Sequence, residues 1–352
     1  MTIEQLWLEM EAEAGANVAW LTRFARPQTG HPLLVALEQT TRARALLVPV
    51  SKAALPPRRE WPECRGLELI SVALGSQPHL GVRLRDPACA DVFTALAEDV
   101  APRVASASGA KQAAAELLGR LRQWQQFLTA ARETLSIEAQ RGLWGELHVL
   151  RTHLLPALGP AATVSGWKAS AAAHQDFQFS GGAVEVKTTA AKQPQSVRIT
   201  SERQLDDTGV GALFLHVVVV DEREVPAGGT VPGQSLPALI ADVRAGLSAD
   251  LIALAAFNDR LLDRGWLDTH ASRYEGRRWT VRGERTYQVR RGFPRLVEVD
   301  LPAGVGDVNF AVSLAACEPF AAPVPLMLAA LREMGTTPKK SGRAQGRLKP
   351  KR

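Results

Sequence analysis

Cysteine is scarce in this sequence, with Cys64, Cys89 and Cys317 as the three examples among 352 residues. They are far apart and odd in number, which excludes a disulfide framework and the paired spacing of a zinc site. We therefore expect them to be small residues of the core.

Long apolar runs and a basic leader are also missing. The longest apolar stretch, residues 212–220, has the length of a strand, whereas a membrane-spanning helix needs about 18 to 20 apolar residues. The first residues, MTIEQLWLEMEAEAG, are acidic, whereas a secretory signal begins basic and then turns apolar. These absences predict a soluble, cytoplasmic protein that does not contact a membrane.

Positive charge is unevenly distributed. The formal net charge is +6, and the residues from Thr336 onward carry seven Lys and Arg and no acid, so the rest of the chain is close to neutral. Residues 336–352 lack apolar periodicity, which predicts a basic, disordered tail. Its lysines, Lys339 and Lys340 among them, could bind DNA phosphates by releasing counterions, although a merely solvated tail has the same composition.

The length of the chain favours two domains or one elaborated domain. Residues 1–110 alternate β-like runs with turn signals and include a helix after Asp86, which predicts an α+β region of unknown role. Residues 111–335 form the second region. They contain helical segments at 111–155 and 235–267, an extended segment at 176–221, and predicted strands at 285–294, 295–301 and 308–316. This order predicts an α/β (α+β) fold with a mixed sheet covered by helices.

The helix predicted before Pro156 has a buried face and an acidic border. Its buried stripe recurs at helical spacing in Leu143, Leu147, Leu150 and Leu154. Glu146 lies at the edge of this stripe, and Gly142 and Gly145 flank it. Each glycine costs about 1 kcal/mol relative to alanine inside a helix, so a close approach of another backbone is expected to compensate. His148 and His153 are five residues apart, which suits metal chelation poorly, so we expect no zinc site there.

The segment HQDFQFSGGAVEVKTTA, residues 174–190, places acidic and basic side chains around a turn. Strand alternation directs Glu185 and Lys187 to one face. A turn at residues 180–182 would bring Asp176 within reach of Glu185 in an antiparallel hairpin. Two carboxylates and an ammonium group would then converge. Carboxylate oxygens hold Mg²⁺, the metal acidifies a water, and a lysine can act on that water or on the charged phosphate.

This pattern resembles the PD-(D/E)XK nuclease superfamily, with Asp176 as the first acid and Glu185 and Lys187 as the acid-x-lysine pair. The proline of the literal motif is absent, since Gln175 precedes Asp176. Glu146 occupies the chain position of a helical glutamate that joins the metal site in many members. The resemblance implies catalytic roles for these four residues and a metal site formed by Asp176, Glu185, Val186 and Glu146.

A closer resemblance covers most of the chain. Its segments are GLWGELHVL, Trp167, HQDF, EVKTT, ITSERQL and NFAVSLAACEPF. They are similar to a bacterial family of PD-(D/E)XK proteins whose genes lie in restriction and phage-defence clusters with DNA methyltransferases and a helicase-like ATPase. This resemblance implies a DNA endonuclease that depends on Mg²⁺ or Mn²⁺, has a restriction-endonuclease-like core within residues 111–335, and works beside such partners.

Other interpretations of these residues stay open. Without the family resemblance, Glu185 and Lys187 would be a surface ion pair worth about 0 to 1 kcal/mol. His174 fits a turn without a catalytic role better than a phosphate contact. Gln204 fits a capping box with Ser201 that opens a helix. Lys192, Arg198 and Arg203 could contact DNA phosphates, although cations that are merely solvated at the surface fit the sequence equally well, and Gln204 is a further candidate for DNA contact.

An alternative function is a non-catalytic subunit that binds DNA or assembles a defence complex while it keeps the nuclease fold. A homodimer is a further expectation, because two DNA strands must be cut, but no motif in the sequence shows one.

Overall fold

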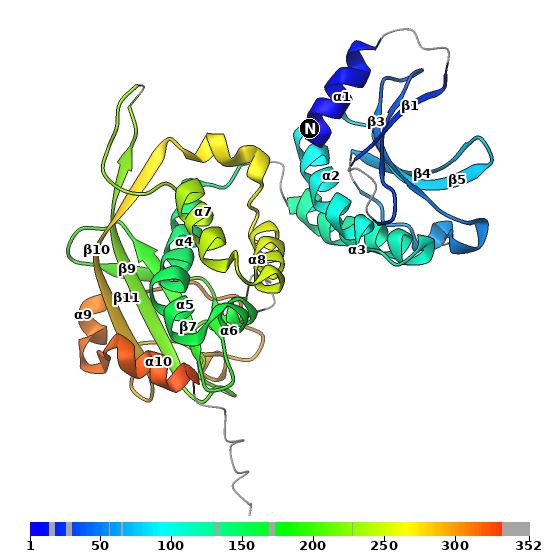
Figure 1. Ribbon diagram of the computed structural model, residues 1–352. Coiled ribbons are helices and arrows are strands. Elements are labelled where there is room, and N and C mark those ends of the chain that lie inside the picture. The colour runs from blue at the N-terminus through cyan, green and yellow to red at the C-terminus, as the bar shows by residue number, and fades with distance from the viewer. Residues whose placement is uncertain are drawn as a thin grey trace, which may run out of the picture. The chain divides into compact units, whose positions relative to one another are not determined.

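A computed structural model of the chain describes residues 1–332, apart from residues 14–17, 26–29, 56, 65, 131–133, 169–172 and 227 and the side chains of residues 126–130. The chain divides into two compact units (Figure 1). Unit 1 comprises residues 1–135 and 265–273, and unit 2 comprises residues 136–264 and the chain from residue 274 onward.

The boundary lies further along the chain than residue 110, where the sequence places it. The reason is that α3 (Ala110–Ala130) packs against α2 (Ala90–Ala105) inside unit 1. Asp99 of α2 accepts a 2.8 Å hydrogen bond from Nε1 of Trp124 and lies 2.5 Å from a guanidinium nitrogen of Arg120, both on α3. A buried charged cluster therefore joins α3 to the N-terminal region.

Unit 1 is an antiparallel sheet with helices. The strands follow the order β1, β2, β3, β5, β4. Their bounds are β1 (Trp20–Phe24), β2 (Leu34–Glu38), β3 (Arg44–Pro49), β4 (Leu67–Leu74) and β5 (Gln77–Leu84). Helix α1 (Ile3–Ala12) packs on β2, where Nε1 of Trp7 donates to the carbonyl of Ala36. Thr2 and Gln5 close the start of α1 as a capping box.

Unit 2 contains the mixed sheet that the sequence predicts. The order is β10, β9, β7, β6, in which β7 and β9 are parallel and the other neighbours are antiparallel. The bounds are β6 (Phe177–Gln178), β7 (Ala183–Thr189), β9 (Leu213–Glu224) and β10 (Arg277–Val289). Residues 213–220 of β9 are buried throughout. A strand covered on both faces explains this uninterrupted apolar run.

One face of this sheet is covered by helices, with α4 and α7 lying across the strands (Figure 1). These helices are α4 (Ile137–Val149), the π-helical turn η4 (Leu150–Leu154), α5 (Leu155–Leu158), α6 (Pro160–Gly166), α7 (Leu236–Leu247) and α8 (Leu251–Asp263). The predicted leucine stripe of α4 and η4 is buried, as expected. Pro156 does not end the helix, because α5 continues directly from the π-turn η4; Gly159, at φ +78°, ends it.

The other face of the sheet carries a smaller layer. Strands β8 (Ser196–Ile199) and β11 (Phe310–Ser313) form an antiparallel pair, followed by α9 (Leu314–Cys317). Helix α10 (Val324–Arg332) instead lies against β10 and η4, where Arg332 donates to the carbonyl of Ala157. Val197, Ile199 and Val312 pack there against Leu215 and Val217 of β9. The helices, the sheet and this layer enclose the core of unit 2.

Three sequence expectations about local structure are wrong. Residues 295–301 form no strand and contain the 3₁₀ turn η6 (Glu298–Asp300), and residues 201–204 form a turn that opens no helix. Cys64 and Cys317 are buried, but Cys89 is half-buried at the end of the 3₁₀ turn η3 (Pro87–Cys89). The further 3₁₀ turns are η1 (Lys52–Ala54), η2 (Arg58–Glu60), η5 (Asp268–Tyr274) and η7 (Glu318–Phe320).

Among the described residues, no helix combines the length and the apolar character that crossing a bilayer requires.

Candidate functional site

The β6–β7 hairpin places Asp176 beside Glu185. Phe177 pairs with Val184, so the residues immediately outside this pair, Asp176 and Glu185, lie opposite each other. The turn closes as the N–H of Phe179 donates to the carbonyl of Gly182 at 2.8 Å. Oδ2 of Asp176 accepts a 2.9 Å hydrogen bond from the N–H of Val186. This bond fixes the Asp176 carboxylate against β7.

Helix α4 brings Glu146 to the same strand. A Cβ atom on Gly145 would stand 1.7 Å from Oγ1 of Thr188 on β7, so this glycine is required for the close approach of helix and strand. Gly142 faces open space, so the compensation expected from the sequence applies to Gly145 alone. The side chain of Glu146 is buried and accepts a 2.8 Å hydrogen bond from Nε1 of Trp167.

An arginine bridges two of the three carboxylates. Nη2 of Arg264 lies 2.8 Å from Oε2 of Glu146 and 3.0 Å from Oδ1 of Asp176. Arg264 follows directly after α8, far along the chain from the acidic motif. Sequence reasoning missed this residue, because nothing in the neighbouring residues marks it; Trp167 entered only as a landmark of the family resemblance.

The Glu185 and Lys187 side chains form a buried pair. Glu185 is 1% exposed, and Nζ of Lys187 lies 2.7 Å from its Oε1. Both carboxylate oxygens of Glu185 are fully buried, and beyond this ion pair neither accepts a hydrogen bond from the described residues. The alternative of a solvent-exposed ion pair is therefore wrong for these two residues.

Gln204 holds the lysine in place. Its Oε1 accepts hydrogen bonds from Nζ of Lys187 at 3.1 Å and from the N–H of Thr200 at 2.9 Å. The capping box expected with Ser201 is absent, since no helix begins there. Gln204 instead connects the turn after β8 to the candidate site, and its contact with DNA stays a prediction.

Burial and neighbouring charges shift the pKa values of the side chains in this cluster. Desolvation raises the pKa of Glu185 to about 8, and the neighbouring Asp176 adds to the shift. Desolvation also raises the pKa of Glu146 to about 8, although Arg264 opposes the shift. Burial alone would lower the pKa of Lys187, but Glu185 and Asp176 outweigh it and raise that pKa above its ordinary value. The lysine is therefore an ammonium group, and two of the carboxyl groups hold protons near neutral pH.

The donor set suits a hard divalent cation. Asp176, Glu185 and Glu146 supply carboxylate oxygens from a loop, a strand and a helix, and Mg²⁺ prefers oxygen ligands. Glu185 Oε1 pairs with Lys187, and Oε2 is buried without a partner among the described residues, so it is an atom that a cation would satisfy. Val186 contributes its N–H to Asp176, and its side chain is buried. Arg264 and Lys187 neutralise part of the negative charge in this structure.

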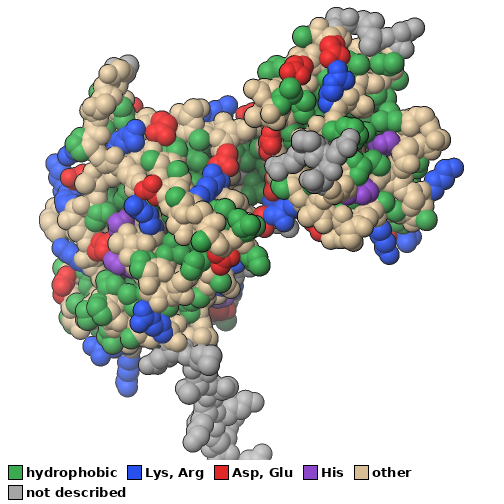
Figure 2. Space-filling model, viewed as in Figure 1, with side chains coloured by type: hydrophobic (Ala, Val, Ile, Leu, Met, Phe, Trp, Pro, Cys, Tyr) green, Lys and Arg blue, Asp and Glu red, His purple; other side chains and the backbone are tan. Residues whose placement is uncertain are grey.

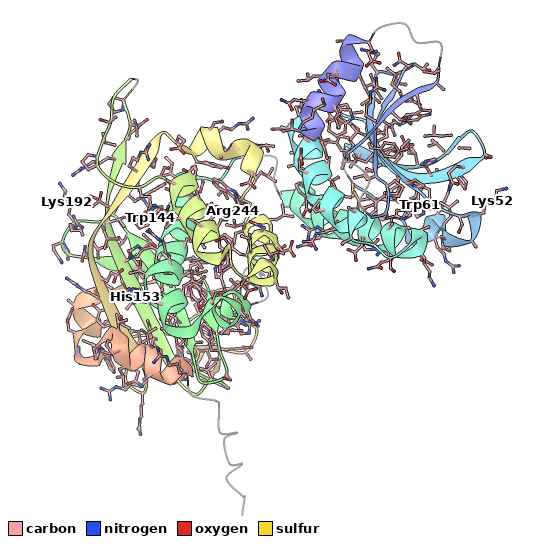
Figure 3. The ribbon with its side chains drawn as sticks, viewed as in Figure 1. Lys52, Trp61, Trp144, His153, Lys192 and Arg244 are labelled. Atoms are coloured by element: carbon pink, nitrogen blue, oxygen red, sulfur yellow. The ribbon has the colours of Figure 1, made fainter. Side chains whose placement is uncertain are left out.

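The residues expected to contact DNA are more dispersed. Lys192 is exposed after β7, at the outer edge of unit 2 (Figure 3), and lines a cavity of about 350 Å³ with Arg282 and Arg285. Arg198 is exposed on β8, and Arg203 is exposed 3.8 Å from Glu202. His174 is exposed beside Asp176 in the chain. Lys339 and Lys340 lie outside the described residues.

Comparison with known protein families gives a match over most of the chain. The model of the family described as “Putative PD-(D/E)XK family member, (DUF4420)” matches residues 3–315, which include Glu146, Asp176, Glu185 and Lys187. No curated protein and no solved structure matches the chain. The mixed sheet flanked by helices is the restriction-endonuclease-like architecture that the family implies. Since the match spans nearly the whole sequence, the chain belongs to this PD-(D/E)XK family.

Proposed function

We propose that this protein is a metal-dependent DNA endonuclease that hydrolyses phosphodiester bonds in a bacterial restriction or phage-defence system. The observation that carries the proposal is the convergence of Asp176, Glu185, Lys187 and Glu146. They come from three separate elements and lie in one buried cluster. The oxygens of the three carboxylates are not all within 4.8 Å of one another while Lys187 and Arg264 pair with them, so the proposal requires these side chains to move closer when an ion binds. A purely structural ion-pair cluster has no need for a buried carboxylate such as Glu185, whose Oε2 has no partner among the described residues.

The side chains have distinct roles in this proposal. Asp176, Glu185 and Glu146 hold Mg²⁺ or Mn²⁺, the divalent metals that suit a PD-(D/E)XK site. When bound, such an ion lowers the pKa of a water and neutralises charge on the phosphate. Lys187, fixed by Glu185 and Gln204, keeps its ammonium group beside the carboxylates, where it can orient the attacking water or stabilise the developing negative charge.

Arg264 supports a second candidate function. Its guanidinium lies within hydrogen-bonding distance of both Asp176 and Glu146, where it supplies the positive charge that a metal would otherwise supply. A protein that keeps this arrangement when it meets DNA would be a binding or assembly subunit that retains the fold without cutting. The endonuclease proposal instead requires Arg264 to share Asp176 with the metal or to move away from it.

Cleavage of DNA by the full chain distinguishes the two functions. Supercoiled plasmid is incubated with the protein and Mg²⁺ or Mn²⁺, and nicked and linear products are measured. We expect cutting by the wild type and its loss in Asp176→Asn, Glu185→Gln and Lys187→Ala. The exposed Lys52→Ala and Glu138→Gln variants serve as matched controls and should cut normally. Full activity in the three site variants would contradict the assignment.

A second experiment tests whether Arg264 competes with a metal ion for the carboxylates. If the chain is a binding subunit, wild type binds DNA without cutting, and Lys187→Ala leaves the affinity unchanged. If it is an endonuclease, Arg264→Ala should raise the apparent affinity for Mg²⁺, because the competing guanidinium is gone. Isothermal titration with Mg²⁺, with Arg244→Ala of α7 as an arginine control, separates these outcomes.

The biological setting belongs to the same proposal. The protein would act on DNA in the bacterial cytoplasm beside a DNA methyltransferase and a helicase-like ATPase, and as a homodimer if one chain cuts each strand. Lys192, Arg198 and Arg203 are exposed cations near the motif in sequence and would contact phosphates. Comparing methylated with unmethylated plasmid, with and without the co-encoded subunits, measures how far these partners control cutting.

A further inference from the structure

A π-helical turn interrupts the long helix of unit 2 directly after α4. It spans residues Leu150–Leu154, and the N–H of Leu155 donates to the carbonyl of Leu150, five residues earlier. In an α-helix, side chains five residues apart point about 140° away from each other, whereas a π-turn brings them to the same side. The sequence argument against a paired role for His148 and His153 assumed α-helical geometry and is wrong for this turn.

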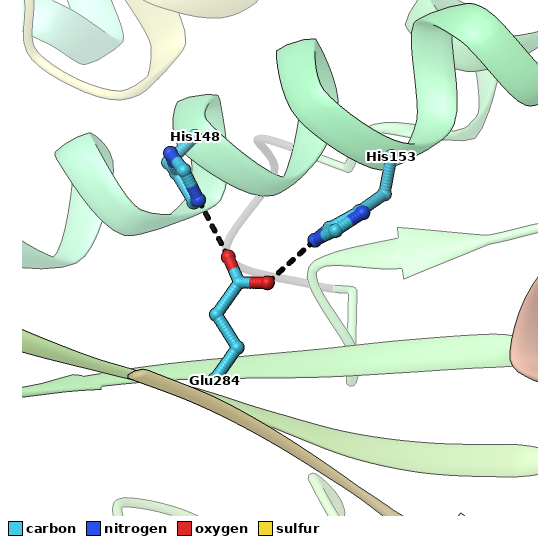
Figure 4. Close-up of side chains that lie close together, drawn as sticks. All are labelled: His148, His153 and Glu284. Atoms are coloured by element: carbon cyan, nitrogen blue, oxygen red, sulfur yellow. Dashed lines mark hydrogen bonds and ion pairs between the residues drawn. The ribbon is translucent and has the colours of Figure 1, made fainter. Parts of the chain in front are cut away.

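The two histidines meet one carboxylate on the sheet. Nε2 of His148 lies 2.5 Å from Oε1 of Glu284, and Nε2 of His153 lies 2.8 Å from Oε2 (Figure 4). The side chains are 17%, 15% and 21% exposed in the order His148, His153, Glu284, so solvent reaches them. Figure 2 shows histidine and acidic side chains gathered at this surface of unit 2.

A third imidazole adjoins the cluster from below. His216 of β9 is fully buried, and its ring centroid is 5.5 Å from that of His153. Its Nδ1 is 2.8 Å from Oγ1 of Thr286, the residue that pairs with it across the sheet. Its Nε2 is buried without a hydrogen-bond partner. An unpartnered polar nitrogen at this depth costs free energy, and His216 adjoins the cluster without being one of the three groups close enough to share an ion.

We propose that His148, His153 and Glu284 form a binding site for a divalent transition-metal ion, with Zn²⁺ as the natural occupant. Two imidazole nitrogens and a carboxylate oxygen suit Zn²⁺ and related ions, whereas Mg²⁺ and Ca²⁺ prefer oxygen ligands. The three ligand atoms lie within 4.8 Å of one another, close enough to surround one ion. Among the described residues, the carboxylate oxygens around Lys187 do not all lie this close to one another.

The competing explanation is a hydrogen-bonded cluster that merely ties the helix to the sheet. A structural hydrogen bond of this kind needs one histidine. His270 in unit 1 is an example, since its Nε2 pairs with Asp91 at 3.0 Å. The second histidine and the rare π-turn that presents it exceed what such a structural contact requires. The ion would fasten η4 to β10 and would anchor α4, which carries Glu146 two residues before His148. The site is independent of the nuclease proposal.

Metal binding by the full chain tests the site. The protein is stripped with a chelator and titrated with Co²⁺, whose visible absorption reports nitrogen and oxygen ligands, and then with Zn²⁺ by calorimetry in excess Mg²⁺. We expect one ion per chain. In His148→Gln/His153→Gln the affinity should fall by more than about 100-fold, since even outer-shell changes cost roughly 10 to 100-fold. Glutamine keeps an N–H donor for Glu284, so folding should survive.

Two controls and one alternative variant keep the result interpretable. His270→Gln removes a histidine paired with one carboxylate and should bind as the wild type. Asp176→Asn/Glu185→Gln should also retain the ion, which separates this site from the proposed nuclease centre. Glu284→Gln, which preserves an acceptor for the histidines, replaces the double variant if that one fails to fold. Absence of Co²⁺ absorption, unchanged affinity in the histidine variant, or loss in Asp176→Asn/Glu185→Gln would each overturn the proposal.

Discussion

Glu146 and Glu185 are carboxyl groups whose surroundings oppose ionisation. Both are buried, and Asp176 adds a negative charge nearby, so the pKa of each rises from 4.5 to about 8. The folded, metal-free protein therefore binds protons that the unfolded chain has released between about pH 4.5 and 8. Because stability falls with pH wherever the folded state binds more protons, these two groups destabilise the metal-free fold progressively through that window.

Metal binding should reverse the fall in folding stability with rising pH. A divalent cation needs ionised carboxylates, so its affinity should rise by about tenfold per pH unit for each group that must lose a proton, up to about pH 8. We expect the Mg²⁺-induced increase in the unfolding temperature to be small at about pH 6 and large at about pH 8.5. Differential scanning calorimetry with and without Mg²⁺ measures this difference.

Glu138 supplies the control for this measurement. It lies exposed in the first turn of α4, and Glu138→Gln should leave the pH dependence unchanged. Glu185→Gln should abolish most of it. Equal stabilisation by Mg²⁺ at both pH values in the wild type would show that the buried glutamates do not bind the ion.

At the scale of elements, the contact between α4 and β7 controls where Glu146 lies. Helix α4 begins at Ser136, whose Oγ accepts from the N–H of Ala139, and it approaches β7 through Gly145. The hydroxyl of Thr188 occupies the space that a side chain at Gly145 would need. The geometry of the candidate site thus requires glycine at position 145, because the methyl group of an alanine there would collide with Thr188.

Gly145→Ala should separate α4 from β7. We expect a loss of about 1 to 3 kcal/mol, the usual cost of overpacking, together with reduced DNA cleavage because Glu146 moves with the helix. Gly142→Ala is the matched control, since open space surrounds that position, and it should stabilise the helix by up to about 1 kcal/mol. Hydrogen exchange of the α4 amides measures both effects. Equal protection in the two variants would contradict this account of the packing.

Local sequence patterns predicted the features that depend on neighbouring residues, and they missed the features that depend on tertiary packing. The hairpin register followed from the glycine turn and strand alternation, so Asp176 opposite Glu185 could be predicted. The π-turn could not, because its hydrogen bonds depend on packing that helical periodicity does not encode. Arg264 was also beyond prediction, since its partners Asp176 and Glu146 meet it only through tertiary structure.

At the scale of the whole molecule, positive charge is concentrated at the C-terminal end of the sequence. The chain has a net charge of +6, and residues 336–352 contribute +7, so the remainder carries 6 − 7 = −1. A nearly neutral body gives little long-range attraction to DNA, even though Lys192 and Arg198 are exposed. The last residues should therefore supply much of the non-specific affinity for DNA, while the cluster around Lys187 supplies the chemistry.

Removing residues 336–352 should weaken DNA binding and flatten its dependence on salt. Each phosphate contact contributes about 0.9 to the slope of log affinity against log salt, so losing seven cations can lower that slope by up to about 6. Fluorescence anisotropy with duplex DNA over a range of salt concentrations measures it. A full-length chain with the seven basic residues replaced by glutamine distinguishes charge from length and should behave like the truncated chain. An unchanged slope in both would mean that these cations stay solvated, and that DNA is held by the exposed cations of the folded units instead.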